Sequence, residues 1–94
     1  VLHFSFFLKN NLKNTFFLDC SIREANFSES NLTDARFQGC DLHQTVFERT
    51  NLLSVDFRTA SNYSIYPDAN NIRKARFSYP AVLGLLDKYG IIVV

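Results

Sequence analysis

The sequence predicts an all-β solenoid, a single domain in which short five-residue units stack into coils. The first observation is the period: large apolar residues recur at every fifth position from Leu2 to Phe57 without a slip. The second is a small residue two positions before most of these centres, such as Ala25, Ala35 and Cys40. An amphipathic helix needs apolar spacings of three and four, and a half-buried strand needs alternation, so neither explains a period of five.

Length and charge limit the classes of function. A chain of 94 residues with 47% hydrophobic content has enough apolar side chains for one small core. Ten Lys and Arg against nine Asp and Glu leave a formal charge of +1, with no strongly basic or acidic block. This balance does not predict binding to nucleic acid or to a membrane surface. The longest apolar runs are far too short to span a bilayer, and we find no export signal.

The centres of the repeat alternate Phe with Leu or Ile. A five-residue unit cannot bury its single large side chain alone, so the core has to come from the stacking of successive coils. The predicted core ladder consists of Leu12, Phe17, Ile22, Phe27, Leu32, Phe37, Leu42, Phe47, Leu52 and Phe57.

The units "ANFSE", "SNLTD", "CDLHQ", "TNLLS" and "VDFRT" resemble those of the pentapeptide-repeat family. The family unit reads roughly small, Asp or Asn, Leu or Phe, and two variable residues, and the resemblance covers residues 1–59. It implies a right-handed quadrilateral β-helix of about four coils, with four pentapeptides in each coil. Residues twenty apart should then lie above one another at the ~4.8 Å spacing of paired strands.

The period breaks after Phe57, because the fivefold frame would place Asn62 and Pro67 in the core. Apolar centres return in frame at Ile72 and Phe77. We therefore expect regular repeats at 1–59, a loop insertion at 60–70, the last repeats at 71–78, and a C-terminal helix and strand at 79–94.

The C-terminal stretch "SYPAVLGLLDKYGIIVV" changes period again. Pro80 is typical of a helix start and Gly90 of a helix stop, so we expect a short capping helix followed by a strand at 91–94. The ending also resembles that of family members that confer quinolone resistance, in which this segment forms a two-fold dimer interface. We therefore predict a homodimer whose interface contains Leu83, Leu86, Tyr89, Ile91, Ile92 and Val93.

A second apolar surface is expected at the other end of the solenoid. Five large apolar residues of the first coil fall at outward positions, whereas the positions beneath them in the next coil are polar. Either an absent N-terminal segment or a protein partner could cover this surface. Its residues are Phe4, Phe6, Leu8, Phe16 and Leu18.

Candidates for catalysis are weak. His3 and His43 lie two coils apart, which does not suit a metal site, and most serines and threonines at the small positions face the interior. Cys20 and Cys40 are expected to be buried free thiols, which fit a cytoplasmic protein. We therefore expect no catalytic residue, no metal and no cofactor.

Two classes of function remain. The first is a non-enzymatic scaffold that presents rigid flat faces to a protein partner, because stacked coils create faces rather than a cleft. The alternative, implied by the resemblance, is a mimic of DNA that binds and protects a type II topoisomerase such as gyrase. Such a mimic needs excess acid on its exterior, and the near-neutral charge argues against it. In neither case do we expect direct contact with nucleic acid or a membrane.

Overall fold

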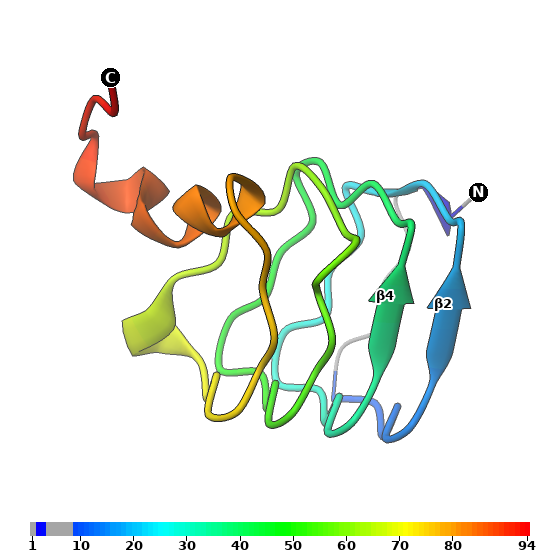
Figure 1. Ribbon diagram of the computed structural model, residues 1–94. Helices are drawn as coiled ribbons and strands as arrows, with labels where there is room; N and C mark the ends of the chain where they lie inside the picture. The colour runs from blue at the N-terminus through cyan, green and yellow to red at the C-terminus, as the bar shows by residue number, and fades with distance from the viewer. Residues whose placement is uncertain (1, 4–8) are drawn as a thin grey trace.

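The parallel pairings of the chain join residues that are twenty apart. In this computed structural model, which describes residues 2–3 and 9–94, β1 (Leu2–His3) pairs with β3 (Ile22–Arg23). Strand β2 (Phe16–Leu18) pairs with β4 (Arg36–Gln38). Isolated bridges continue the register along Asn11, Asn31, Asn51 and Asn71. The predicted β-helix is confirmed, and Figure 1 shows its coils lying side by side.

Ten successive corners of the coils contain a residue in the left-handed conformation. The φ angles at successive corners lie between 49° and 65°, at Lys9, Asn14, Asp19, Glu24, Glu29, Asp34, Gly39, Gln44, Arg49 and Ser54. Where an Asn or Asp precedes a centre, it supports the turn, because its side-chain oxygen accepts a hydrogen bond from the amide two residues later. Asn31 accepts from the Thr33 amide at 3.1 Å, and Asn51 accepts from the Leu53 amide at 3.1 Å. The polar positions of the repeat therefore build its corners.

The interior is filled by the centres of the repeat. The structure buries nine of the ten predicted ladder residues, and Leu12 packs against them partly buried. Phenylalanine rings stack between coils, as in the pair Phe27 and Phe47, whose ring centroids are 5.4 Å apart. Rings on opposite faces meet edge to face, as Phe27 and Phe37 do at 5.9 Å. Ring packing therefore joins neighbouring coils and also crosses the interior.

Small residues lie where the backbones of two coils come close. Ala25, Ala35 and Cys40 are fully buried. Thr50 is also buried, and its hydroxyl donates to the carbonyl oxygen of Phe27 in the coil above, at 3.0 Å. A larger side chain at these positions would force the coils apart.

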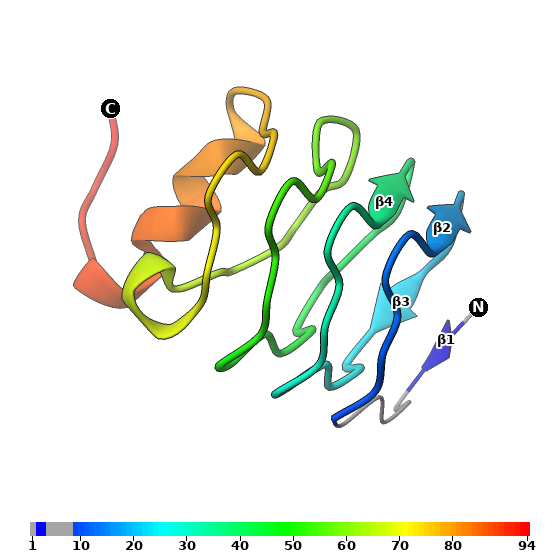
Figure 2. The ribbon, with the colours of Figure 1, turned by 90° about the horizontal axis from the view of Figure 1, so that it is seen from below.

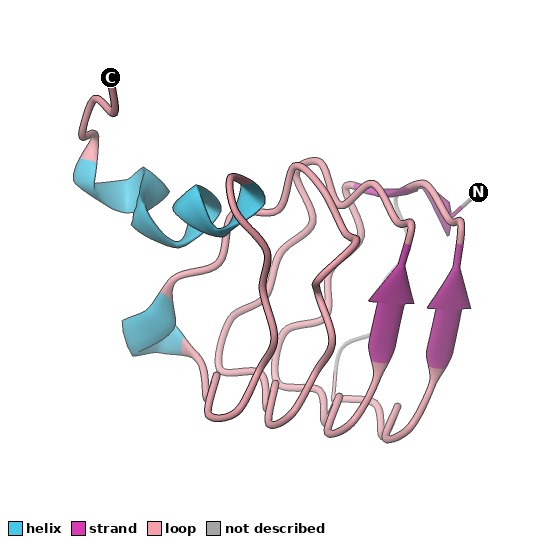
Figure 3. Ribbon diagram, in the orientation of Figure 1, coloured by secondary structure: helices cyan, strands magenta, loops and turns pink. Residues whose placement is uncertain are grey.

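The insertion at 60–70 fills the core without apolar residues at the centres of the fivefold frame, positions 62 and 67. Tyr63 and Ile65 are buried, whereas Asn62 is exposed and Pro67 is half-buried at the start of η1 (Pro67–Ala69). The chain then returns to register, since Asn71 bridges to Asn51. The insertion replaces part of the last coil, and Figure 3 shows η1 on this segment.

The C-terminal helix is the 3₁₀ helix η2 (Ala81–Tyr89), which lies over the last coil (Figure 1). Gly84 faces the insertion so closely that a Cβ atom there would lie 2.1 Å from the carbonyl oxygen of Tyr63. Gly90 ends the helix in the left-handed conformation, with φ of 60°. The prediction of a strand at 91–94 was wrong, because no described residue pairs with the backbone of this segment.

Candidate interaction surfaces

The structure offers little for catalysis within residues 2–3 and 9–94. No three His, Cys, Asp or Glu side chains of that part of the chain come together as metal ligands. His43 is exposed on the surface. No helix among the described residues has the length and apolar character needed to cross a membrane.

Both cysteines are free thiols, with Cys40 buried and Cys20 only partly so. The Cys40 thiol donates to the carbonyl oxygen of Phe17 at 3.4 Å. Burial raises the pKa of Cys40 to about 11. Because the thiolate is the reactive form, this shift makes Cys40 a poor nucleophile and fits a packing role.

The apolar surface predicted for the first coil is described only in part. Phe4, Phe6 and Leu8 lie outside the described residues. Phe16 is 52% exposed and Leu18 is 51% exposed. In the next coil they pair with Arg36 and Gln38 of β4. The apolar exterior on this face therefore ends after one coil.

A charged surface covers the same face further along the coils. Arg36, Asp56 and Arg76 bridge in succession, and Lys74 lines the same shallow hollow. Arg58 forms an ion pair with Asp56 at 3.0 Å and holds the pKa of that carboxyl below its usual range. Charges of both signs meet here, with basic residues in excess. Exposed pairs of this kind contribute little to stability.

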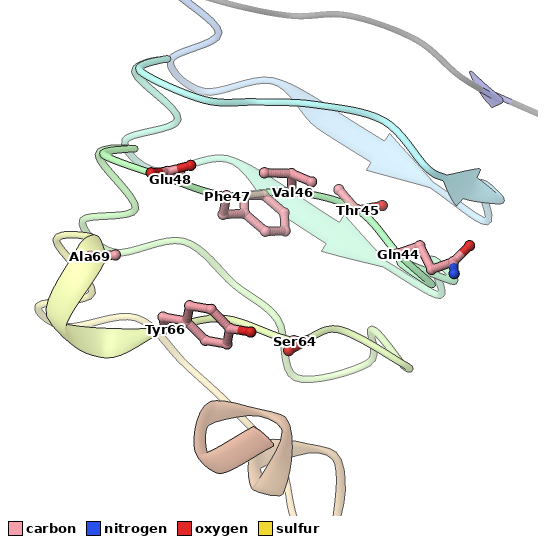
Figure 4. Close-up of a pocket in the computed structure, with 8 residues that line it drawn as sticks. All are labelled: Gln44, Thr45, Val46, Phe47, Glu48, Ser64, Tyr66 and Ala69. Carbon is pink, nitrogen blue, oxygen red and sulfur yellow. The ribbon is translucent and has the colours of Figure 1, made fainter. Parts of the chain in front are cut away.

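The insertion opens a groove in the side of the β-helix, shown in Figure 4. One wall is the third coil at 44–48, and the other wall comes from the insertion at 64–69. The groove has a volume of about 350 Å³. Its residues are Gln44, Thr45, Val46, Phe47, Glu48, Ser64, Tyr66 and Ala69, and we call it the side groove.

The side groove lies where backbone hydrogen bonds between the third coil and the insertion are missing. Leu42 still donates to the carbonyl oxygen of Ser61 at 2.9 Å, and Arg49 donates to that of Ala69 at 2.7 Å. Between them, the amide of Phe47 has no hydrogen-bond partner among the described residues. Sequence reasoning missed this site. The available signal was the break in the fivefold frame, which puts Asn62 at a centre, Tyr63 beside it and the large Ile65 at a small-residue position.

The apolar side chains at the rim of the groove come from both walls. Val46 is 42% exposed and Tyr66 is 43% exposed. Lys88 at the end of η2 lies near this rim, with its ammonium nitrogen 5.7 Å from the centre of the Tyr66 ring. Lys88 also forms an ion pair with Asp68 of η1. The end of η2 and the groove therefore lie in the same part of the molecule.

The C-terminal residues form the largest group of exposed apolar side chains in the described chain. Leu86, Tyr89 and residues 91–94 are exposed, and Ile92 is 87% exposed. Leu83 is half-buried. The structure thus leaves most of the predicted dimer interface open to solvent, and we call residues 91–94 the tail.

Comparison with known proteins gives one match to a family. The model of a family described as "Pentapeptide repeats" matches residues 9–39 and 25–61, with 8 copies of the repeat. No protein of curated function matches the chain. Among solved structures, QnrB1, a plasmid-mediated fluoroquinolone resistance protein studied as its trypsin-treated M102R form, matches at 17% identity with a TM-score of 0.43. That match covers 89% of this chain and 42% of the QnrB1 chain.

Proposed function

Since the chain belongs to the pentapeptide-repeat family, we propose that it is a non-enzymatic scaffold that binds another protein through its rigid outer faces. Hydrogen bonds and stacked rings hold neighbouring coils in register, so the faces of the β-helix are fixed before a partner arrives. A preorganised surface loses little conformational freedom on binding. Cys20 and Cys40 are free thiols. Free thiols are typical of proteins in a reducing compartment, so we place the chain in the cytoplasm as part of this proposal.

The observation that carries this proposal is the apolar surface at the C-terminal end. Exposed apolar groups gathered in one region are typical of protein interaction sites, whereas isolated ones are ordinary. We propose that a second copy of the chain covers this surface and forms a two-fold dimer. Its interface contains Leu83, Leu86, Tyr89, Ile91, Ile92 and Val93.

The charge of the surface favours a scaffold over a mimic of DNA. A mimic that binds a topoisomerase needs rows of acidic groups, because duplex DNA presents phosphates at regular spacing. The charged face of this chain instead carries Arg36, Arg58, Lys74 and Arg76. For this reason we do not assign topoisomerase protection to the chain.

Light scattering of the purified full chain tests the proposed dimer. We expect twice the chain mass at micromolar concentration, and Ile92→Asp should halve it, because it introduces a charge into the apolar surface. Tyr79→Asp is the matched control, since Tyr79 is exposed but lies outside the proposed interface. A wild-type chain that stays monomeric at high micromolar concentration would exclude the dimer.

The scaffold proposal has a separate test. Affinity capture from an extract of the native cell, followed by chemical cross-linking, should join a partner protein to side chains on an outer face. A purified chain that instead turns over a small-molecule substrate would show that the scaffold proposal is wrong.

A further inference from the structure

We propose that the side groove is the binding site for the tail of a second copy, and that residues 91–94 pair there as a β-strand with the backbone at 44–48. The inference rests on the proposed dimer and names the surface that receives the tail. It differs from a contact between two tails, because the groove supplies both backbone partners and an apolar wall.

The backbone of the third coil is open at the groove. One coil earlier, the Phe27 amide donates to the carbonyl oxygen of Val46 at 2.9 Å, and the Val46 amide donates to that of Ala25 at 2.8 Å. The corresponding groups toward the insertion are the Phe47 amide and the Thr45 carbonyl. Neither has a backbone partner among the described residues. An open edge of this kind is a template for an added strand.

The insertion does not pair with this edge. The carbonyl oxygen of Tyr66, one coil after Val46, already accepts from the Ala69 amide at 3.1 Å and from the Asn70 side chain at 3.0 Å. The amide of Tyr66, which the register would pair with the Thr45 carbonyl, has no backbone partner among the described residues either. These bonds between the coil and the insertion are therefore not made, which leaves the edge at 44–48 available to another chain.

The groove also fits the side chains of the tail. Val46, Phe47 and Tyr66 give it apolar walls. Its volume of about 350 Å³ is at the lower end for ligand pockets, so it suits a short extended segment and not a whole helix. The tail is such a segment, with four consecutive β-branched residues and neither charge nor proline.

The geometry favours a second copy over the tail of the same chain. In Figures 1 and 2 the C-terminus leads away from the coils, and in Figure 4 the segment 64–66 lies between η2 and the groove. Lys88, just before the tail, nevertheless lies 5.7 Å from the Tyr66 ring. Because each copy carries its tail and its groove at the same end, two copies can exchange tails about a two-fold axis, which closes the assembly at a dimer.

Amide hydrogen exchange of the full chain, followed by NMR at several concentrations, tests the pairing. The Phe47 amide should exchange about tenfold or more slowly once the protein is concentrated, because the incoming strand accepts its hydrogen bond. The Phe27 amide is the internal control, since it is bonded to Val46 at every concentration. Val46→Lys and Ile92→Asp should each remove the protection of Phe47 and halve the mass in light scattering. Leu18→Lys, an exposed aliphatic residue changed in the same way on another face, should do neither.

The outcomes separate this inference from the proposed dimer. If Val46→Lys remains a dimer and Phe47 is unprotected in the wild type, the dimer stands and the groove is not its site. If Phe47 is protected equally in samples that light scattering shows to be monomeric and dimeric, the tail of the same chain fills the groove and the second copy is excluded. If Ile92→Asp leaves both the mass and the protection unchanged, the tail is not the strand that binds.

Discussion

The rings of Phe37 and Phe57 lie parallel in adjacent coils, with centroids 5.3 Å apart and an angle of 2° between their planes. Phe37 stacks in the same way on Phe17, at 4.7 Å. Phe37 is therefore packed between two rings in the same column.

Phe37→Ala should lower the free energy of unfolding by about 3 to 5 kcal/mol, because it leaves a cavity in the middle of a stacked column. Urea denaturation followed by circular dichroism measures the loss. Phe16→Ala is the control, since the Phe16 ring is half-exposed and its removal opens no cavity. A loss below about 1 kcal/mol for Phe37→Ala would contradict the packing described here.

Tyr63→Phe should raise the free energy of unfolding by about 1 kcal/mol. The Tyr63 hydroxyl is buried and has no hydrogen-bond partner among the described residues. Folding therefore removes its bound water without replacing the hydrogen bonds, and a phenylalanine avoids this cost. Thermal or urea denaturation of the two proteins measures the difference. Tyr79→Phe, at an exposed position, should leave the stability unchanged. A less stable Tyr63→Phe protein would show that the hydroxyl does have a partner.

Alkaline pH should destabilise the fold through Cys40. Burial raises the pKa of this thiol from its usual value of 9.0 to about 11, so the folded chain holds the proton at a pH where the unfolded chain releases it. The free energy of unfolding should therefore fall as the pH rises from 9 to 11. Urea denaturation with reductant at intervals across this range measures the slope.

The variant Cys40→Ala separates the thiol from other groups that titrate at alkaline pH. It should show a shallower fall than the wild type between pH 9 and 11, whatever its stability at neutral pH. An identical slope in the Cys40 variant and the wild type would show that Cys40 does not cause the fall.

Asn70→Ala should destabilise the insertion by about 1 to 3 kcal/mol, because it removes the side-chain partners of the part-buried Thr50 amide and Phe47 carbonyl. The Asn70 side chain accepts from the Thr50 amide at 3.0 Å and donates to the carbonyl oxygens of Phe47 at 2.9 Å and Tyr66 at 3.0 Å. Urea denaturation measures the total loss, and faster amide exchange at 64–69 would locate it.

Asn70→Asp is the matched variant, since a carboxylate keeps the oxygen that accepts from Thr50 but cannot donate to Phe47 or Tyr66. Its free energy of unfolding should be lower than that of the wild type, because both donated bonds are lost. If neither substitution changes stability or exchange, Asn70 does not hold the insertion in place.

The regular part of the fold was predictable because every unit obeys the same local rule. A large apolar centre such as Leu32 and a small residue such as Ala35 recur in a fixed frame, so a single spacing sets the register of twenty that joins Asn31 to Asn51. The resemblance to pentapeptide repeats rested on the same frame, and the family match confirms it. Repetition makes each local choice agree with the global fold.

The period of five was therefore enough to predict the stacking of the coils and the family. The course of the insertion became visible only in three dimensions, where Tyr63 and Ile65 occupy the core and Tyr66 turns its ring to the side groove. The tertiary structure also decided that residues 91–94 form no strand within their own chain. Both features depend on which backbone groups in distant parts of the chain remain unpaired, such as the Phe47 amide. A local period in the sequence does not show whether a backbone group in another coil is paired.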